Sequence, residues 1–193
     1  MQSLLALALA ALLLALAAPL RAEPTEITAL EAERRADGVL VSAQLRFDLP
    51  DAVEDALHKG IPVFFVAEAL LLRERWYWYD KEVASATRYM RLSYQPLTRR
   101  WRLQLSSTPI GSAGLALGQN FDTQEEALAA VQRISGWKIA EPVNGDPDRR
   151  YYLNLRFRLD TSQLPRPFQI GLVGQPDWNI SAARSVYLPP EIR

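Results

Sequence analysis

The stretch VLVSAQLRFDL, residues 39–49, decides the fold of this chain. From Val39 to Leu49 every second residue is apolar, and four of the five residues between them are polar or charged. This period of two is typical of a β-strand with one dry face. Asp37-Gly38, directly before it, is a favoured tight-turn pair, so the segment 25–34 is predicted to be the other strand of a hairpin.

Other segments extend the same pattern. Residues 151–160 alternate like residues 39–49, and the segments 84–94 and 100–106 are predicted to form a second hairpin, joined by a turn that contains Pro96. The segment 61–72 is apolar on both sides apart from Glu68, which is typical of a central strand covered on both faces.

Two short segments are predicted to be helical. Residues 51–59 end before Gly60, and residues 121–135 end before Gly136. In the second, Thr123 and Glu126 have the spacing of a capping box. Strands joined by hairpins, with only two helices, predict a mainly β (β-rich α+β) fold, an antiparallel two-layer β-sandwich with two short helices. A single curved sheet with the second helix across one face is the alternative.

The first 22 residues resemble a secretory signal peptide. Their apolar run, residues 4–18, is about five residues shorter than a membrane-spanning helix requires. We expect cleavage after Ala22, a single domain over 23–193 and no stable membrane anchor; retention of the leader as an anchor is the alternative. The chain has no cysteine, so the domain must fold without disulfides.

Charge and histidine content exclude several kinds of site. After residue 22 the chain has one more acidic than basic residue, which indicates no general affinity for nucleic acid. His58 is the only histidine, so a zinc site of Cys and His is excluded, and His58 itself fits the end of a helix. Glycines 111, 114 and 118 match no phosphate-binding loop. We therefore predict no cofactor, metal site or catalytic residue.

Glu68 stands alone in an apolar run, and we predict a structural buried carboxylate paired with an arginine of a neighbouring strand. The best candidate for a binding surface is the segment 73–81, four aromatic residues framed by charge. Its candidate residues are Arg73, Arg75, Trp76, Tyr77, Trp78, Tyr79 and Lys81. If the segment were extended, the two tryptophans would share one face and the two tyrosines the other. Aromatic and arginine side chains dominate binding hot spots, although cross-strand packing also explains this cluster and a second one at 99–102.

Several motifs carry a resemblance to a known family. They are Gly60-Ile61-Pro62, Phe65-Val66-Ala67-Glu68, Arg75-Trp76-Tyr77-Trp78-Tyr79-Asp80, Arg91-Leu92-Ser93-Tyr94 with Leu97-Thr98-Arg99, and the run from Leu159 to Gln169. With them the chain resembles a proteobacterial family of exported proteins, domain of unknown function 4390, also described as proline rich signal peptide proteins. The resemblance implies no activity, cofactor or site residue. It implies a Gram-negative periplasmic location and genes beside a membrane sensor histidine kinase.

These observations lead to three hypotheses. The first is a non-enzymatic periplasmic binding domain that contacts an envelope protein, such as a membrane sensor kinase, through residues 73–81. The second is a hydrolase of an envelope polymer that uses two carboxylates, such as Glu68 and Asp80, and requires both to face one cleft. The third is a purely structural envelope protein, which predicts neither a cleft nor an exposed aromatic patch. The sequence leaves the oligomeric state open.

Overall fold

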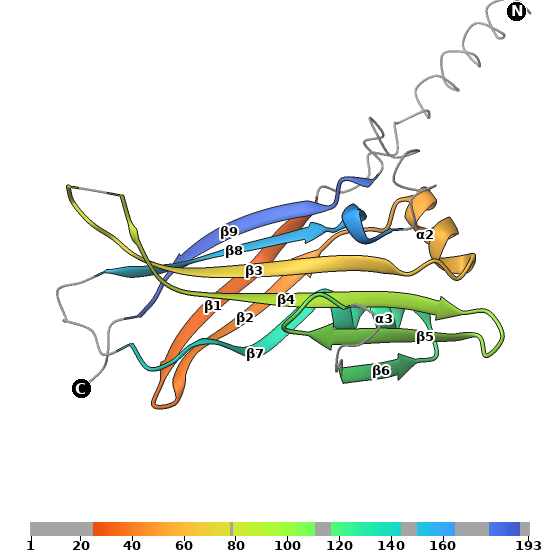
Figure 1. Ribbon diagram of the computed structural model, residues 1–193, viewed down its shortest axis with the longest axis horizontal. Coiled ribbons are helices and arrows are strands. Elements are labelled where there is room, and N and C mark those ends of the chain that lie inside the picture. The colour runs from red at the N-terminus through yellow and green to blue at the C-terminus, as the bar shows by residue number, and fades with distance from the viewer. Residues whose placement is uncertain (1–24, 78, 111–116, 144–149, 165–177, 190–193) are drawn as a thin grey trace, which may run out of the picture.

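The computed structural model describes residues 25–77, 79–110, 117–143, 150–164 and 178–189. They form two antiparallel sheets packed face to face with two short helices, which confirms the predicted sandwich (Figure 1). The smaller sheet has the order β1-β2-β7, and the larger has the order β6-β5-β4-β3-β8-β9. In Figure 1, β1 and β2 run obliquely behind the larger sheet.

The smaller sheet begins with the predicted hairpin. Strands β1 (Glu26–Arg35) and β2 (Gly38–Arg46) pair directly, and β7 (Arg133–Ala140) lies along the other side of β2. Alternate residues of β2 are buried, as the period of two predicts. Gly38 has a φ of +143°, and a Cβ at this position would lie 2.2 Å from the carbonyl oxygen of Ala140. The hairpin can therefore pack against β7 only with glycine here.

The larger sheet is built around β3 (Val63–Arg73), which lies between β4 (Lys81–Gln95) and β8 (Tyr151–Leu159). This confirms the central strand, and β4 with β5 (Arg100–Ser106) confirms the second hairpin. The outer strands are β6 (Leu117–Phe121) and β9 (Ser181–Tyr187). A short 3-10 helix, η1 (Thr161–Gln163), follows β8.

Three phenylalanines join the two sheets at the centre of the core. Phe157 of β8 lies parallel to Phe65 of β3, with ring centroids 5.6 Å apart and planes at 14°. Phe47, directly after β2, approaches both rings, at 5.4 Å from Phe157 and 5.7 Å from Phe65. All three side chains are buried.

The first helix agrees with the prediction and the second does not. Helix α2 (Asp51–His58) ends before Gly60, whose φ is +79°. Helix α3 (Gln124–Val131) is shorter than the predicted 121–135, because the following residues form β7. The predicted cap is present, since Thr123 Oγ1 accepts a hydrogen bond from the backbone N–H of Glu126 at 3.2 Å. Gly136 lies inside β7, so it does not end the helix.

One side of the sandwich is closed by a side chain from the last strand. Arg184 of β9 donates from Nη1 to the carbonyl oxygens of Ile27 and Thr28, at 2.7 Å each. These two carbonyls belong to β1, next to the irregularity between Ile27 and Ala29 in its pairing with β2. The first and last strands of the described fold are thus tied together.

Candidate functional site

The aromatic segment forms the loop between β3 and β4, at one end of the molecule (Figure 1). The segment is not an extended strand, because strand pairing ends with Arg73 opposite Lys81 and residues 74–77, 79 and 80 belong to no strand. The rings therefore do not alternate between two faces of a sheet. Trp78 lies outside the described residues.

The described aromatic side chains of this loop are highly exposed. Trp76 is 92% exposed, Tyr79 is 87% exposed and Tyr77 is 68% exposed. Cross-strand packing does not account for them, although Trp76 and Tyr77 contact each other edge to face with centroids 4.9 Å apart. Tyr187, at the end of β9, is also exposed. We call Trp76, Tyr77, Tyr79 and Tyr187 the aromatic end.

Asp80 holds the loop in place. Its Oδ1 accepts a hydrogen bond from the backbone N–H of Arg75 at 3.1 Å, and its Oδ2 accepts one from the hydroxyl of Tyr152 at 2.6 Å. The backbone N–H of Glu74 also donates to the carbonyl oxygen of Arg150, next to β8. One carboxylate thus joins the start of the loop, its end and the neighbouring strand.

Beside this anchor lies a pocket of about 300 Å³. Its walls come from the loop, β8 and β9, three segments that the sheet order brings to the same end of the molecule. The lining residues are Glu74, Asp80, Tyr152, Ser185, Val186 and Tyr187. The rings of Tyr152 and Tyr187 meet edge to face, with centroids 6.1 Å apart.

The hydrogen bond between Tyr152 and Asp80 shifts the pKa values of both groups. The bond from the Tyr152 hydroxyl, followed by that from the Arg75 backbone, lowers the pKa of Asp80 below 3.8. The same bond to Asp80 is the largest reason that the pKa of Tyr152 rises from 10.0 to about 12. Both shifts favour the pair as it stands at neutral pH, a carboxylate that accepts from a protonated phenol.

We therefore expect Tyr152 to titrate near pH 12, above the ordinary tyrosine value. Because its pKa is raised in the folded state, the stability that this bond contributes is fully present below pH 10 and is lost as the pH rises through 12. ¹³C NMR of labelled tyrosine rings would follow the titration, with Tyr152→Phe to assign the signal. Asp80→Asn should return the pKa toward 10, and an unshifted Tyr152 in the wild type would contradict the geometry.

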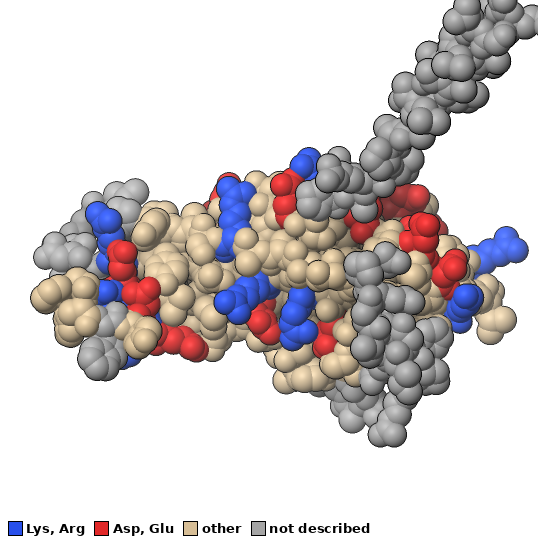
Figure 2. Space-filling view, turned by 90° about the horizontal axis from the view of Figure 1, so that it is seen from above, with Lys and Arg blue, Asp and Glu red and all other residues tan. Residues whose placement is uncertain are grey.

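The charged residues predicted for this surface frame the loop. Lys81 is exposed and Arg73 and Arg75 are half-buried, while Glu74 and Asp80 are exposed beside them. Figure 2 shows basic and acidic side chains next to each other at this end of the molecule. The surface is therefore mixed in charge, with aromatic rings between charges of both signs.

The second basic and aromatic cluster, residues 99–102, is explained by packing between strands, the alternative given for it in the sequence analysis. Trp101 of β5 is only 4% exposed and lies against Tyr94 of β4, with centroids 4.9 Å apart. His58 packs its ring edge to face on Trp101 at 5.7 Å, and its Nδ1 lies 2.9 Å from the carbonyl oxygen of Glu54. The only histidine thus lies at the end of a helix.

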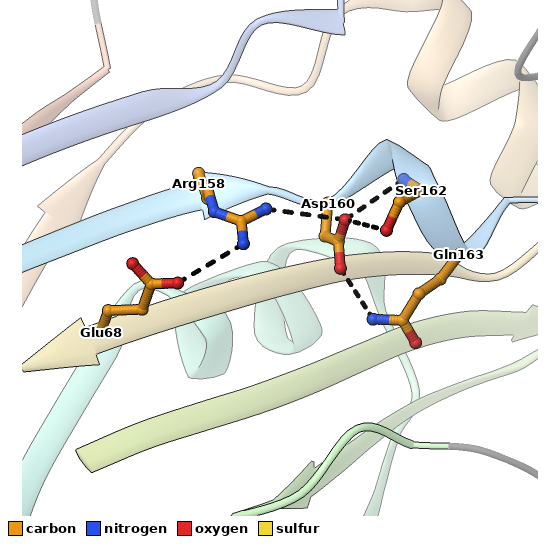
Figure 3. Close-up of polar contacts among 5 residues, drawn as sticks. All are labelled: Glu68, Arg158, Asp160, Ser162 and Gln163. Atoms are coloured by element: carbon orange, nitrogen blue, oxygen red, sulfur yellow. Dashed lines mark hydrogen bonds and ion pairs between the residues drawn. The ribbon is translucent and has the colours of Figure 1, made fainter. Parts of the chain in front are cut away.

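Glu68 is paired with an arginine, but it is not buried. Its carboxylate lies 3.4 Å from the guanidinium of Arg158, and its side chain is 39% exposed (Figure 3). The prediction of burial is wrong because β3 is covered on both faces only in its first half, Val63–Ala67, and from Glu68 onward its buried residues alternate with half-buried ones. Arg158 also lies 3.6 Å from Asp160.

We expect Glu68→Ala to lower the free energy of unfolding by less than about 1 kcal/mol, because half-exposed ion pairs contribute little. Arg158 keeps its second partner, Asp160, in this variant. Urea unfolding of the two proteins would measure the difference. A loss near 3 kcal/mol, the size expected for breaking a buried pair, would contradict the half-exposed pair seen here.

Among the described residues, the buried carboxylate is Asp160, at 8% exposure. Its Oδ1 accepts from the backbone and the hydroxyl of Ser162, at 3.2 and 2.6 Å, and its Oδ2 accepts from the amide of Gln163 at 2.8 Å (Figure 3). Burial alone would raise its pKa, but these hydrogen bonds and the charge of Arg158 outweigh burial and lower the pKa below 3.8. Asp160 thus fixes the turn from β8 into η1.

We expect Asp160→Asn to cost about 2 kcal/mol of stability at pH 7, because the bond from Gln163 loses its acceptor and the bonds from Ser162 lose a charge. The lowered pKa means that this stability is fully present above pH 3.8 and declines as the pH falls below it. Denaturant unfolding at several pH values should show the wild type and the variant converging in acid. A difference that does not depend on pH would contradict an ionised Asp160.

Of the two carboxylates named in the hydrolase hypothesis, Asp80 lines the pocket and Glu68 is not among its described lining residues. Asp80 is bonded to Tyr152, which pairs with Leu72, and Leu72 is four residues along β3 from Glu68. At ~3.3 Å per residue, the Cα atoms of Leu72 and Glu68 are about 13 Å apart along β3. The lowered pKa of Asp80 is also the opposite of what a general acid requires.

Among the described residues, no group of three or more His, Asp or Glu side chains is arranged to hold a metal ion. Within the same ranges, no helix has the length and apolar character to cross a membrane.

Comparison with known proteins identifies a domain family. A family model described as "Domain of unknown function (DUF4390)" matches residues 22–187. No curated protein and no solved structure matches the chain.

Proposed function

Because the chain belongs to this domain family of unknown function, which brings no activity with it, we propose a function from its own surface. The protein is an exported, non-enzymatic binding domain that recognises a protein partner through the aromatic end. The observation that carries this proposal is the exposure of Trp76, Tyr77 and Tyr79 on a loop that Asp80 holds in place.

The energetics of exposed aromatic rings support binding. An aromatic side chain offers roughly 150–250 Å² for burial, and full burial of a large apolar side chain contributes about 1.5–3 kcal/mol. The fold gains little of this from the three loop rings, so a partner that covers them can gain it. Because the loop is already anchored, less conformational entropy is lost on binding.

The partner class and the location come from the leader and the family resemblance. Residues 1–22 have the composition of a signal peptide, so the proposed location is the Gram-negative periplasm. The proposed partner is an envelope protein, such as a membrane sensor kinase. A purely structural role would require neither an exposed aromatic patch nor a pocket, and both are found at the aromatic end.

Site-specific photo-crosslinking in living cells tests the proposal. A benzophenone side chain replaces Tyr77 or Tyr79 in the full chain, and a matched control replaces Leu97, which is 101% exposed on the turn at the opposite end (Figure 1). We expect discrete protein adducts from the two loop positions and none from Leu97. The adducts should be found in the periplasmic fraction, and the crosslinked chain should begin at Glu23.

Three outcomes would overturn parts of the proposal. Absence of adducts from both loop positions, or the same adducts from Leu97, would show that the aromatic end is not the contact surface. Adducts that contain no sensor kinase would contradict the proposed partner. A chain that stays in the cytoplasm would contradict the proposed periplasmic location.

A further inference from the structure

The pocket beside the aromatic loop has a composition that selects a particular ligand chemistry. Its described lining includes two carboxylates, Glu74 and Asp80, and no Lys or Arg side chain. A carboxylate only accepts hydrogen bonds, and the Tyr152 hydroxyl already donates to Asp80. The two carboxylates therefore favour a ligand with hydrogen-bond donors and positive charge, while the hydroxyl groups of Ser185 and Tyr187 can donate or accept.

The aromatic walls fit the same chemistry. The faces of tyrosine rings attract cations, and the rings of Tyr152 and Tyr187 lie beside the carboxylates with an interplanar angle of 62°. Val186 adds an apolar surface against which a methylene chain can lie. At about 300 Å³ the pocket is at the small end of ligand sites, which suits one side chain.

The negative charges of Glu74 and Asp80 both lie near the hydroxyl of Tyr152. Asp80 is a carboxylate at neutral pH, and the hydrogen bond from Tyr152 lowers its pKa further. The charge of Glu74 also contributes, after the larger effect of Asp80, to the raised pKa of Tyr152, which places Glu74 close to the same phenol.

We infer that the pocket binds a basic side chain, the ammonium of a lysine or the guanidinium of an arginine, from the protein partner. This inference rests on the proposed function. The cation lies between Glu74 and Asp80 and against the tyrosine rings, while the exposed rings of Trp76, Tyr77 and Tyr79 contact the residues around it. A neutral sugar fits less well, because its hydroxyl groups both donate and accept and carry no charge to match two carboxylates.

Peptide titration tests the pocket directly. The probes are acetyl-Gly-Lys-Gly-amide and the same peptide with Nε-acetyl-lysine, which keeps the stem and removes the charge. Amide NMR shifts of Glu74, Ser185 and Tyr187 report binding in the full domain. We expect the lysine peptide to shift these signals, the acetylated peptide to shift them at least tenfold less at equal concentration, and added salt to weaken the effect.

Two matched variants locate the charge that matters. Glu74→Gln keeps the backbone hydrogen bond to Arg150 and should weaken the binding of the lysine peptide at least fivefold. Glu82→Gln removes an exposed charge of β4 that does not line the described pocket, and it should change binding less than twofold. Equal binding of both peptides, equal effects of both variants, or tighter binding of an N-acetylglucosamine trimer would overturn the inference.

Crosslinking from Tyr77 separates this inference from the proposed function. If adducts form in the wild type while the lysine peptide leaves the pocket signals unchanged, the pocket inference fails and the aromatic end remains the contact surface. If the peptide binds as expected but no adducts form, the proposed protein partner fails and only a pocket for cations remains.

Discussion

Gly38→Ala is expected to lower the free energy of unfolding by about 4 kcal/mol. A Cβ at this position would lie 2.2 Å from the carbonyl oxygen of Ala140 and 2.9 Å from Cε of Lys138. The lysine chain can move, but the carbonyl belongs to the backbone of β7, so the hairpin must separate from β7 or change conformation. The φ of +143° adds strain that only glycine avoids.

Gly136→Ala is the matched control for this variant. Gly136 also has a positive φ, +54°, but a Cβ there would have Leu40 Cδ2 at 4.0 Å as its nearest neighbour. We expect a loss of about 1 kcal/mol from backbone strain alone. Urea unfolding of the three proteins would measure both effects, and equal losses in the two variants would show that the approach to Ala140 is not what requires glycine.

Phe157→Ala is expected to cost about 4 kcal/mol, because it removes the ring that lies against both Phe65 and Phe47. Phe157 is 1% exposed and lies opposite Ala67 in the pairing of β8 with β3, so small neighbours on that row cannot fill the cavity. Since domains are stable by about 5–15 kcal/mol, this variant should be close to unfolding. Thermal and urea unfolding would show the loss.

Two further variants calibrate the effect of Phe157→Ala. Phe157→Leu retains most of the volume and should cost about 1.5 kcal/mol. Leu97→Ala alters a fully exposed side chain and should stay within about 0.5 kcal/mol of the wild type. If Phe157→Ala were no worse than Phe157→Leu, the three rings would not form a packed connection between the sheets.

Strands with one dry face were predictable because their period is visible in the sequence. The alternation in residues 39–49 and 151–160 corresponds to alternate burial in β2 and β8. The capping spacing of Thr123 and Glu126 also predicted a real hydrogen bond. In each case neighbouring residues contain the information.

The second helix was predicted too long because its continuation depends on a distant partner. Ile134 fits the apolar stripe of a helix, yet it is buried as a strand residue opposite Ala43 of β2. Residues 133–140 form a strand because they pair with β2, and the local sequence pattern does not reveal this pairing. Gly136, which suggests a helix end, is accommodated within this strand.

The aromatic loop was identified as a candidate surface, but its conformation and its pocket could not be predicted. Trp76 and Tyr77 are residue types with high strand propensity, and the segment is a loop because the pairing of β3 with β4 ends where Arg73 lies opposite Lys81. The pocket needs Ser185 and Tyr187, more than one hundred residues away along the chain. The signal that was missed is Tyr152, a tyrosine on the polar side of an alternating strand.

The tie between Arg184 and the carbonyls of Ile27 and Thr28 has a consequence for how the chain folds. It joins residues 156 and 157 positions apart, nearly the whole length of the described fold. Contacts of such long range form late and slow folding, because the intervening chain must first lose its freedom. This side of the sandwich therefore cannot close before β9, the last strand of the described residues, is in place.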